Sequence, residues 1–151
     1  MPVTMRSRSA IGRSSRATTA RGSGPTANTR STPQASIAHD CGLIVNPDGL
    51  KHTIEGNIIQ GISRTLWEEV KFDNKSVTSV DWLTYPILDM TEAPETIDCV
   101  YINRPDRAPT GAGEPSIRPV AAAIANAVFD ATGVRMRRVP FSPDRVKGAL
   151  S

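Results

Sequence analysis

The sequence predicts an α+β fold in which two main helices pack on a small mixed sheet, behind an N-terminal head of different composition. Three observations support this prediction: a helical apolar stripe in residues 47–67, a strand pattern in residues 95–103, and a second helical pattern in residues 117–131. The order of the elements is helix, strands, helix, strand, which is typical of the α+β class. The chain has 151 residues, of which 5% are aromatic, so it can form one domain with a modest core of aliphatic side chains.

The first helix is predicted from one apolar stripe. Its members recur at steps of four residues: Leu50, Ile54, Ile58, Ile62 and Leu66. This spacing predicts a helix that begins near Pro47 and ends near Trp67. Gly56 and Gly61 inside the helix each cost about 1 kcal/mol relative to Ala, which indicates that another backbone or a ligand comes close to them.

Three further segments are predicted as strands. Residues 68–80, EEVKFDNKSVTSV, fit two short strands around an Asp-Asn-Lys turn. Residues 95–103, ETIDCVYIN, fit one strand with apolar side chains on both faces, and we expect both faces to be largely buried. Residues 134–141, VRMRRVPF, alternate as a last strand.

The second main helix follows a loop that contains glycine, TGAGEP. Its apolar positions run from Ile117 to Ala131, and Gly133 predicts its C-terminal end. Residues 142–150 fit a short final helix, capped by Ser142 and with Pro143 in its first turn.

Residues 1–37 form the predicted head. Half of the first 38 residues are Arg, Ser or Thr, and residues 1–39 contain six arginines but no Asp, Glu or Lys. Such a segment has too little apolar surface to offset the entropy of ordering it, so we predict a disordered head and a folded body in residues 38–151. A targeting segment, a polyanion-binding tail and an out-of-frame or truncated stretch are three interpretations, and the abrupt start of the pattern at Ile37–Asp40 favours the last.

The net charge of +3 is divided unevenly, because residues 40–151 hold twelve basic and fifteen acidic residues. The body is therefore mildly acidic, which argues against a nucleic-acid-binding body.

No apolar run approaches the ~20 residues that span a bilayer. Cys41 and Cys99 are too few for a disulfide framework, and two thiols in a reducing compartment predict a cytoplasmic location, with the periplasm as the alternative.

Glu114 is the first candidate functional residue. It precedes Pro115 at the start of the second helix, where the helix dipole favours an acid, so an ordinary helix cap is one interpretation. The other is a carboxylate directed at a ligand, because Gly111 and Gly113 leave the backbone open to close approach. TGAG is not a phosphate loop, since no Lys and Ser/Thr pair follows it.

Four residues suggest a metal site at first: His39, Asp40, Cys41 and His52. Their spacing differs from that of paired zinc ligands, so we predict that they do not bind a metal. Gln60 lies beside the apolar stripe and fits a partly exposed helix residue. Arg104 and Arg107 flank the glycine loop, where they could hold its shape or meet an anion.

Three segments together resemble a known family. They are DCGLIVNP at 40–47, IEGNIIQGISRTLWEEV at 54–70 and TGAGEPSIRPVAAAIANAV at 110–128. In this order and spacing they resemble the C-terminal part of the molybdopterin-binding large subunit of the molybdenum hydroxylases, the xanthine dehydrogenase and aldehyde oxidase family. The resemblance is strongest to the isoquinoline 1-oxidoreductase β-subunit type and covers residues 38–150.

The resemblance implies a fold and a chemistry. The body would be the last part of a second molybdopterin-binding domain, and Glu114 would be the general base that takes a proton from a molybdenum-bound hydroxyl. Gln60 would contact the cofactor, and Ala112 and Gly113 would bring the backbone close to it. The implied cofactor is molybdopterin in a dinucleotide form, with iron–sulfur clusters on a partner subunit, and the implied substrates are N-heterocycles or aldehydes.

The large subunits of that family are several times longer than this chain. The resemblance therefore implies a fragment that holds the base and part of the cofactor site, has little or no activity alone, and has the missing upstream part as a partner. A different class of function remains as the alternative. It is a small non-enzymatic protein that binds an anion or a partner through residues 110–115 and the start of the following helix.

Overall fold

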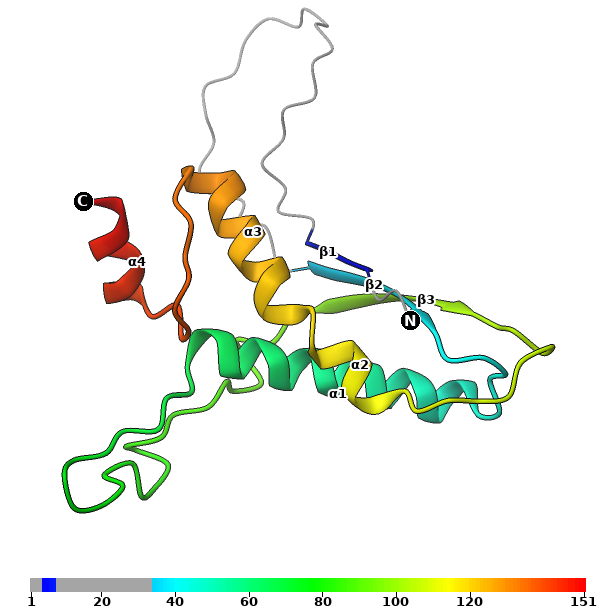
Figure 1. The fold of residues 1–151 in the computed structure, drawn as a ribbon, viewed down its shortest axis with the longest axis horizontal. Helices are drawn as coiled ribbons and strands as arrows, with labels where there is room; N and C mark the ends of the chain where they lie inside the picture. Colours follow the sequence, from blue (N-terminus) through cyan, green and yellow to red (C-terminus); the bar gives the residue numbers. More distant parts are fainter. Residues whose placement is uncertain (1–3, 8–33) are drawn as a thin grey trace, which may run out of the picture.

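The computed structural model describes residues 4–7 and 34–151 (Figure 1). Its elements are β1 (Thr4–Ser7), β2 (Gln34–Asp40), α1 (Pro47–Leu66), β3 (Thr96–Ile102), α2 (Gly113–Ile117), α3 (Val120–Thr132) and α4 (Pro143–Leu150). The predicted α+β class is confirmed, and α1 and α3 are the two main helices.

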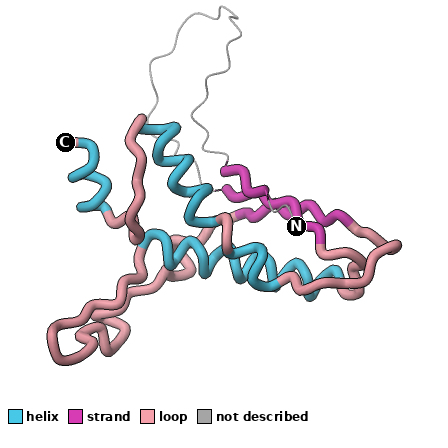
Figure 2. The backbone as a smooth tube through the Cα atoms, in the orientation of Figure 1, coloured by secondary structure: helices cyan, strands magenta, loops and turns pink. Residues whose placement is uncertain are grey.

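The strands form one mixed sheet in the order β1-β2-β3. β2 pairs with β1 antiparallel and with β3 parallel, and Ile37 lies opposite Cys99 in the parallel pair. Helix α1 runs along one face of this sheet, and α2 and α3 pack on α1 (Figures 1 and 2). The arrangement is the predicted one of helices on a small mixed sheet.

Helix α1 is the centre of the core. Ile54 and Ile58 are fully buried on its sheet-facing side, together with Ile37 of β2 and Val120 of α3. The predicted bounds of this helix are confirmed within one residue. It begins at a proline whose preceding residue, Asn46, accepts a hydrogen bond from the amide of Gly49 at 2.9 Å, which is the usual way an asparagine caps a helix.

Gly61 allows α1 and α3 to approach each other. A Cβ atom placed on Gly61 would lie 2.8 Å from a methyl carbon of Val120, a distance that side-chain carbons do not tolerate. The expectation that a glycine in this helix marks a close approach is therefore confirmed for Gly61.

The second helix is interrupted. The turn at Arg118 and Pro119 separates α2 from α3, since proline cannot donate the backbone hydrogen bond that would continue the helix. Its predicted end is confirmed, because Gly133 adopts a left-handed conformation with φ of 76°. The predicted Ser142 cap of α4 is confirmed as well, since its side chain accepts a hydrogen bond from the Arg145 amide.

Two predicted strand regions are wrong. Residues 68–80 form an irregular loop with one isolated bridge, Phe72 to Val77. The predicted turn within them is present, because the side chain of Asp73 accepts hydrogen bonds from the amides of Lys75 and Ser76. Residues 134–141 connect α3 to α4 without strand pairing among the described residues. The amide of Phe141 donates instead to the carbonyl of Thr65 in α1 at 2.7 Å.

The prediction that β3 is largely buried on both faces is also wrong for this chain. One face, which includes Cys99 and Tyr101, packs partly against the core. On the other face Val100 is 62% exposed and Ile102 is 43% exposed.

Parts of the predicted head belong to the sheet. β1 and the first residues of β2 lie within residues 1–37, whereas residues 1–3 and 8–33 lie outside the described residues.

In the part of the chain that is described, no helix combines the length and the apolar character needed to cross a membrane.

Candidate functional site

The loop before α2 is held by the turn that follows β2. Cys41, Gly42 and Leu43 make three backbone hydrogen bonds with residues 104–110: Arg104 N–H to Gly42 O at 3.0 Å, Leu43 N–H to Arg107 O at 3.1 Å, and Thr110 N–H to Cys41 O at 2.8 Å. We call this set of contacts the clasp. It joins the DCG motif to the strip of chain that leads directly to Glu114.

Gly42 is required in the clasp for two reasons. Its φ is +80°, in the left-handed region that favours glycine. A Cβ atom at this position would also lie 2.3 Å from the carbonyl oxygen of Ala108. Asp40 supports the turn by accepting a hydrogen bond from the Gly42 amide at 3.0 Å.

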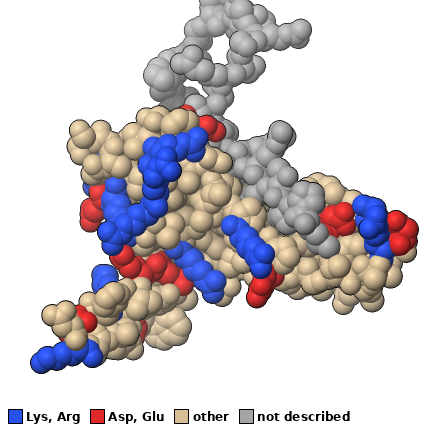
Figure 3. Space-filling view, in the orientation of Figure 1, with Lys and Arg blue, Asp and Glu red and all other residues tan. Residues whose placement is uncertain are grey.

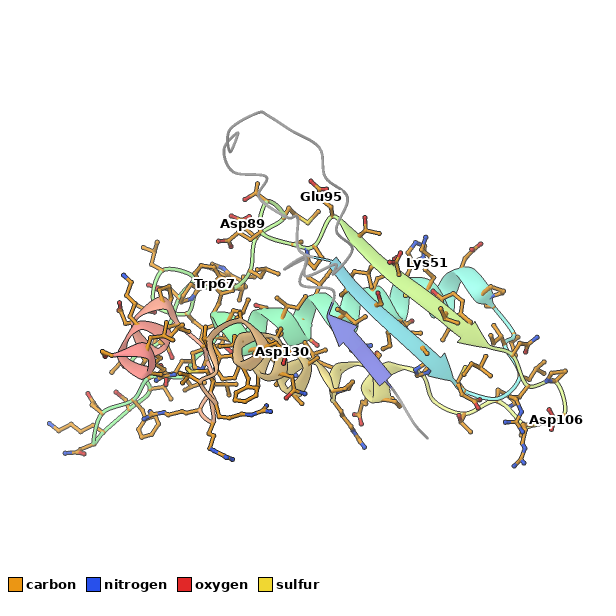
Figure 4. All side chains as sticks on the ribbon, turned by 90° about the horizontal axis from the view of Figure 1, so that it is seen from above. Lys51, Trp67, Asp89, Glu95, Asp106 and Asp130 are labelled. Carbon is orange, nitrogen blue, oxygen red and sulfur yellow. The ribbon has the colours of Figure 1, made fainter. Side chains whose placement is uncertain are left out.

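Arg104 and Arg107 form ion pairs within this region. Arg104 pairs with Asp40 at 3.6 Å and with Asp106 at 3.5 Å, and Arg107 pairs with Asp106 at 3.7 Å. Asp106 lies beyond the C-terminal ends of β2 and β3 (Figure 4). Of the two roles left open for these arginines, the structure supports the one of holding the shape of the loop.

Glu114 is the second residue of α2, and the N-cap position is occupied by Ala112. The interpretation of Glu114 as the helix cap is therefore wrong. Its side chain is 85% exposed and lies 3.4 Å from Arg118, one helical turn further along. An exposed pair of this kind contributes roughly 0–1 kcal/mol, so it leaves the carboxylate available to other groups.

The other predicted cofactor residues lie on α2 and α1. Ala112 packs partly against the core, and a Cβ atom placed on Gly113 would lie 3.9 Å from the side-chain nitrogen of Asn57 in α1. Gln60, in the next turn of α1, is exposed. The structure thus places the Glu114 loop against the turn of α1 that precedes Gln60.

The space around these residues is open. A Cβ atom built on Gly111 would have no described atom within 4 Å beyond the adjacent residues, and one built on Gly56 would have none beyond the adjacent residues and the backbone of α1. Gln60 and Gly56 line a groove of about 340 Å³ between α1 and the loop that follows it, with Trp82 on the far side. None of residues 110–115 lines this groove. We call Gln60, Ala112, Gly113 and Glu114 together the wall.

Sequence reasoning missed two residues that shape this wall. Ser116 is fully buried, and its hydroxyl donates to the carbonyl of Gly113 at 2.8 Å, which fixes the first turn of α2. Asn57 donates to the carbonyl of Thr53 at 2.8 Å and lies beside Gly113. The signal for Asn57 was its position one turn before Gly61, on the side of α1 that faces the second helix.

The four residues considered for a metal site do not converge. Among the described residues, no group of three or more His, Cys, Asp or Glu is placed to hold a metal ion. His39 of β2 is buried. Burial lowers its pKa by more than the nearby Asp40 carboxylate raises it. Cys41 and Cys99 are free thiols whose pKa values are raised by burial.

Comparison with known proteins agrees with this arrangement of motifs. A family model described as a molybdopterin cofactor-binding domain matches residues 26–94. A nicotinate dehydrogenase subunit from Pseudomonas putida is 49% identical over 114 residues, which is 76% of this chain and 10% of that protein. The beta subunit of isoquinoline 1-oxidoreductase from Brevundimonas diminuta is 33% identical over 116 residues, which is 77% of this chain and 15% of that protein.

A solved structure shares the fold. The aldehyde oxidoreductase of Desulfovibrio gigas superposes with a TM-score of 0.68 and 31% sequence identity, covering 79% of this chain and 13% of that protein. The chain belongs to the molybdopterin-binding subunits of the xanthine dehydrogenase and aldehyde oxidase family of molybdenum hydroxylases. It spans about a tenth to a seventh of the length of the relatives described above.

Proposed function

We propose that the chain supplies the C-terminal part of the molybdopterin-binding subunit of an enzyme that hydroxylates N-heterocycles or aldehydes with oxygen from water. The observation that carries this proposal is the exposed carboxylate of Glu114, on a loop fixed by the clasp, in a chain of this family. Since the chain matches only 10% of its nicotinate dehydrogenase relative, we propose that it has little or no activity alone.

In this proposal each residue of the wall has a separate role. Glu114 acts as the general base and takes the proton from the water-derived hydroxyl that attacks the substrate carbon. Gln60 binds the cofactor from α1 through its side-chain amide, and Ala112 and Gly113 hold the backbone close to it. The chemistry that bound molybdopterin supplies is the two-electron oxidation of the substrate carbon.

Glu114 needs further protein to act in this way. A carboxylate is a more effective base when it is removed from bulk water, because water stabilises its ionised form. In the isolated chain the side chain is 85% exposed. The proposal therefore includes the rest of the subunit, which would cover the loop and exclude water from it.

The wider assembly is part of the same proposal. We propose a dinucleotide form of molybdopterin, and a partner subunit whose iron–sulfur clusters receive the electrons. The cytoplasm is the proposed location, with the periplasm as the alternative.

A chimaera tests the role of Glu114. Residues 34–151 replace the matching segment in the nicotinate dehydrogenase subunit from Pseudomonas putida, which is produced with its natural partners and assayed for nicotinate oxidation with a dye acceptor. We expect Glu114→Gln to lower kcat by roughly 10²- to 10⁴-fold, the usual contribution of a general base, while the molybdenum content stays unchanged.

Glu95→Gln is the matched control. Glu95 is exposed and lies near the start of β3, at the opposite end of the sheet from Asp106 (Figure 4). We expect this variant to keep the kcat of the chimaera. If Glu114→Gln also kept it, and the short chain bound an anion saturably through residues 110–115, the non-enzymatic alternative would be correct instead.

A further inference from the structure

Residues 68–92, which we call the outer loop, join α1 to the segment before β3 and project away from the sheet (Figure 1). The outer loop exposes many of the large apolar side chains of the described chain. Leu83 is 92% exposed, Met90 is 91% exposed and Trp82 is 76% exposed. Five more apolar side chains of the loop are also exposed: Val70, Phe72, Val77, Val80 and Ile87. These eight exposed apolar side chains lie within one loop rather than singly across the surface, which indicates a contact with another polypeptide.

The apolar side chains are exposed although the outer loop has a defined backbone. Asp73 accepts hydrogen bonds from the amides of Lys75 at 2.7 Å and Ser76 at 2.8 Å. Asp81 accepts hydrogen bonds from the amides of Leu83 at 3.1 Å and Thr84 at 2.9 Å. These turns fix the backbone that carries the apolar side chains before any partner binds, which lowers the entropy lost on binding.

The outer loop is also tied to the body. The hydroxyl of Tyr85 donates to Glu68 at 2.8 Å, and the amide of Leu88 donates to the hydroxyl of Ser63 in α1 at 3.0 Å. Leu88 packs against the core, and Trp82 faces α1 across the groove that Gln60 also lines. A polypeptide that covers Trp82 would therefore also close the open side of that groove.

We propose that the outer loop is the surface on which the remaining part of a molybdopterin-binding subunit docks. This inference rests on the proposed function, because it assumes that the chain works within a longer subunit. The length comparison supports it, since 90% of the nicotinate dehydrogenase subunit has no counterpart in the matched segment. The partner surface is expected to be apolar with a basic rim, because the outer loop carries six acidic residues and two lysines.

The charge of the outer loop argues against two other occupants. In a symmetric dimer the same patch meets itself, which would bring two net-acidic loops together. An anionic lipid surface attracts basic rather than acidic segments. Acidic and basic side chains both lie among uncharged residues on this part of the surface (lower left in Figure 3). Residues 8–33 contain arginines but one large apolar residue, Ile11, so they cannot fill an apolar surface of this size.

Hydroxyl-radical footprinting of side chains tests the docking directly. The isolated 151-residue chain is compared with the full-length chimaera described above, and the labelling rates of Trp82, Leu83 and Met90 are measured by mass spectrometry. We expect each rate to fall at least about 10-fold in the chimaera, because these side chains become buried there. Equal rates in the two proteins would overturn the proposal. Protection that grows with the concentration of the isolated chain would also overturn it, in favour of a second copy.

A set of substitutions gives an independent test. Trp82→Ser, Leu83→Ser and Met90→Ser together should leave the urea midpoint of the isolated chain unchanged, because these side chains are exposed there. In the chimaera the same set should lower the yield of assembled, molybdenum-containing enzyme at least about 10-fold. The control set is Val139→Ser with Leu150→Ser, which are exposed on the C-terminal segment. If the chimaera with the three outer-loop substitutions gave the same yield of assembled enzyme as the chimaera with the control substitutions, the outer loop would not be the docking surface.

The two proposals can fail separately. If the chimaera is active and depends on Glu114, but its outer loop stays accessible, only the docking surface is wrong. If the outer loop becomes protected but Glu114→Gln keeps full turnover, only the proposed base is wrong.

Discussion

The core around α1 and the outer loop are both ordered, but different interactions order them. In the core, Ile54 and Ile58 are completely removed from water between the sheet and α3. In the outer loop, the carboxylates of Asp73 and Asp81 bind nearby amides while Leu83 stays exposed. Burial thus stabilises the first region, and local hydrogen bonds shape the second. The comparison teaches that exposed apolar side chains need not indicate an unstructured segment.

The largest effect should come from truncating the core. Ile58→Ala should lower the free energy of unfolding by about 2–5 kcal/mol, because the removed carbons leave a cavity between α1 and the sheet. Leu83→Ala removes a side chain of similar size that is 92% exposed, and should change the free energy by no more than about 0.5 kcal/mol. Urea unfolding followed by circular dichroism measures both, and similar losses in the two variants would contradict the comparison.

An intermediate effect should come from Gly56 and Gly61, two of the three glycines of α1. Gly61→Ala should destabilise the chain by about 1–3 kcal/mol, because its Cβ atom would meet Val120 at 2.8 Å and force the helices apart. Gly56→Ala is the matched substitution at an open position of the same helix, and should stabilise it by up to about 1 kcal/mol. Thermal unfolding of the pair measures the difference, and a stabilising Gly61→Ala would show that α1 and α3 do not pack closely.

The smallest effect should come from acid acting on the outer loop. The hydrogen bond from the Thr84 hydroxyl, and then those from the Thr84 and Leu83 amides, hold the pKa of Asp81 below its usual value. A carboxylate with a lowered pKa in the folded state contributes stability that is present above its unfolded pKa of about 3.9 and is lost as the pH falls through the folded pKa.

The fluorescence of Trp82 should therefore change as the pH falls below about 4. Trp67 also contributes fluorescence, so the titration is recorded with Trp67→Phe as background. Asp81→Asn should remove the transition. A transition that persists in this variant would show that another group, such as Asp73 or Asp89, controls the loop.

The helices could be predicted from the sequence because their signals are local. The stripe from Leu50 to Leu66 lies within α1, and the Ser142 cap directly precedes α4. The strand predictions for 68–80 and 134–141 failed because a strand also needs a partner edge. Among the described residues neither segment pairs with the outer edge of β1 or β3, and the backbone amide of Phe141 donates to Thr65 of α1 instead.

The loop that carries Glu114 can be recognised in the sequence, but the contacts that hold this loop cannot. The motif that contains Glu114 could be read directly, and so could the exposure of Gln60 on α1. The contact of Gly42 with Ala108 could not be read, because nothing local to either residue indicates the other. The same limit applies to Val100 and Ile102, whose apolar side chains predicted burial that this chain alone does not provide.

The clasp has a consequence for recombination between relatives. It joins residues 41–43 to residues 104–110 through backbone groups, so most side chains in these segments can differ between parents without disturbing it. Gly42 is the exception, because any larger residue there would displace Ala108 and with it the strip that leads to Glu114. A crossover anywhere between the two segments therefore yields a hybrid with a correctly placed carboxylate only when the parent that donates the first segment has glycine at this position.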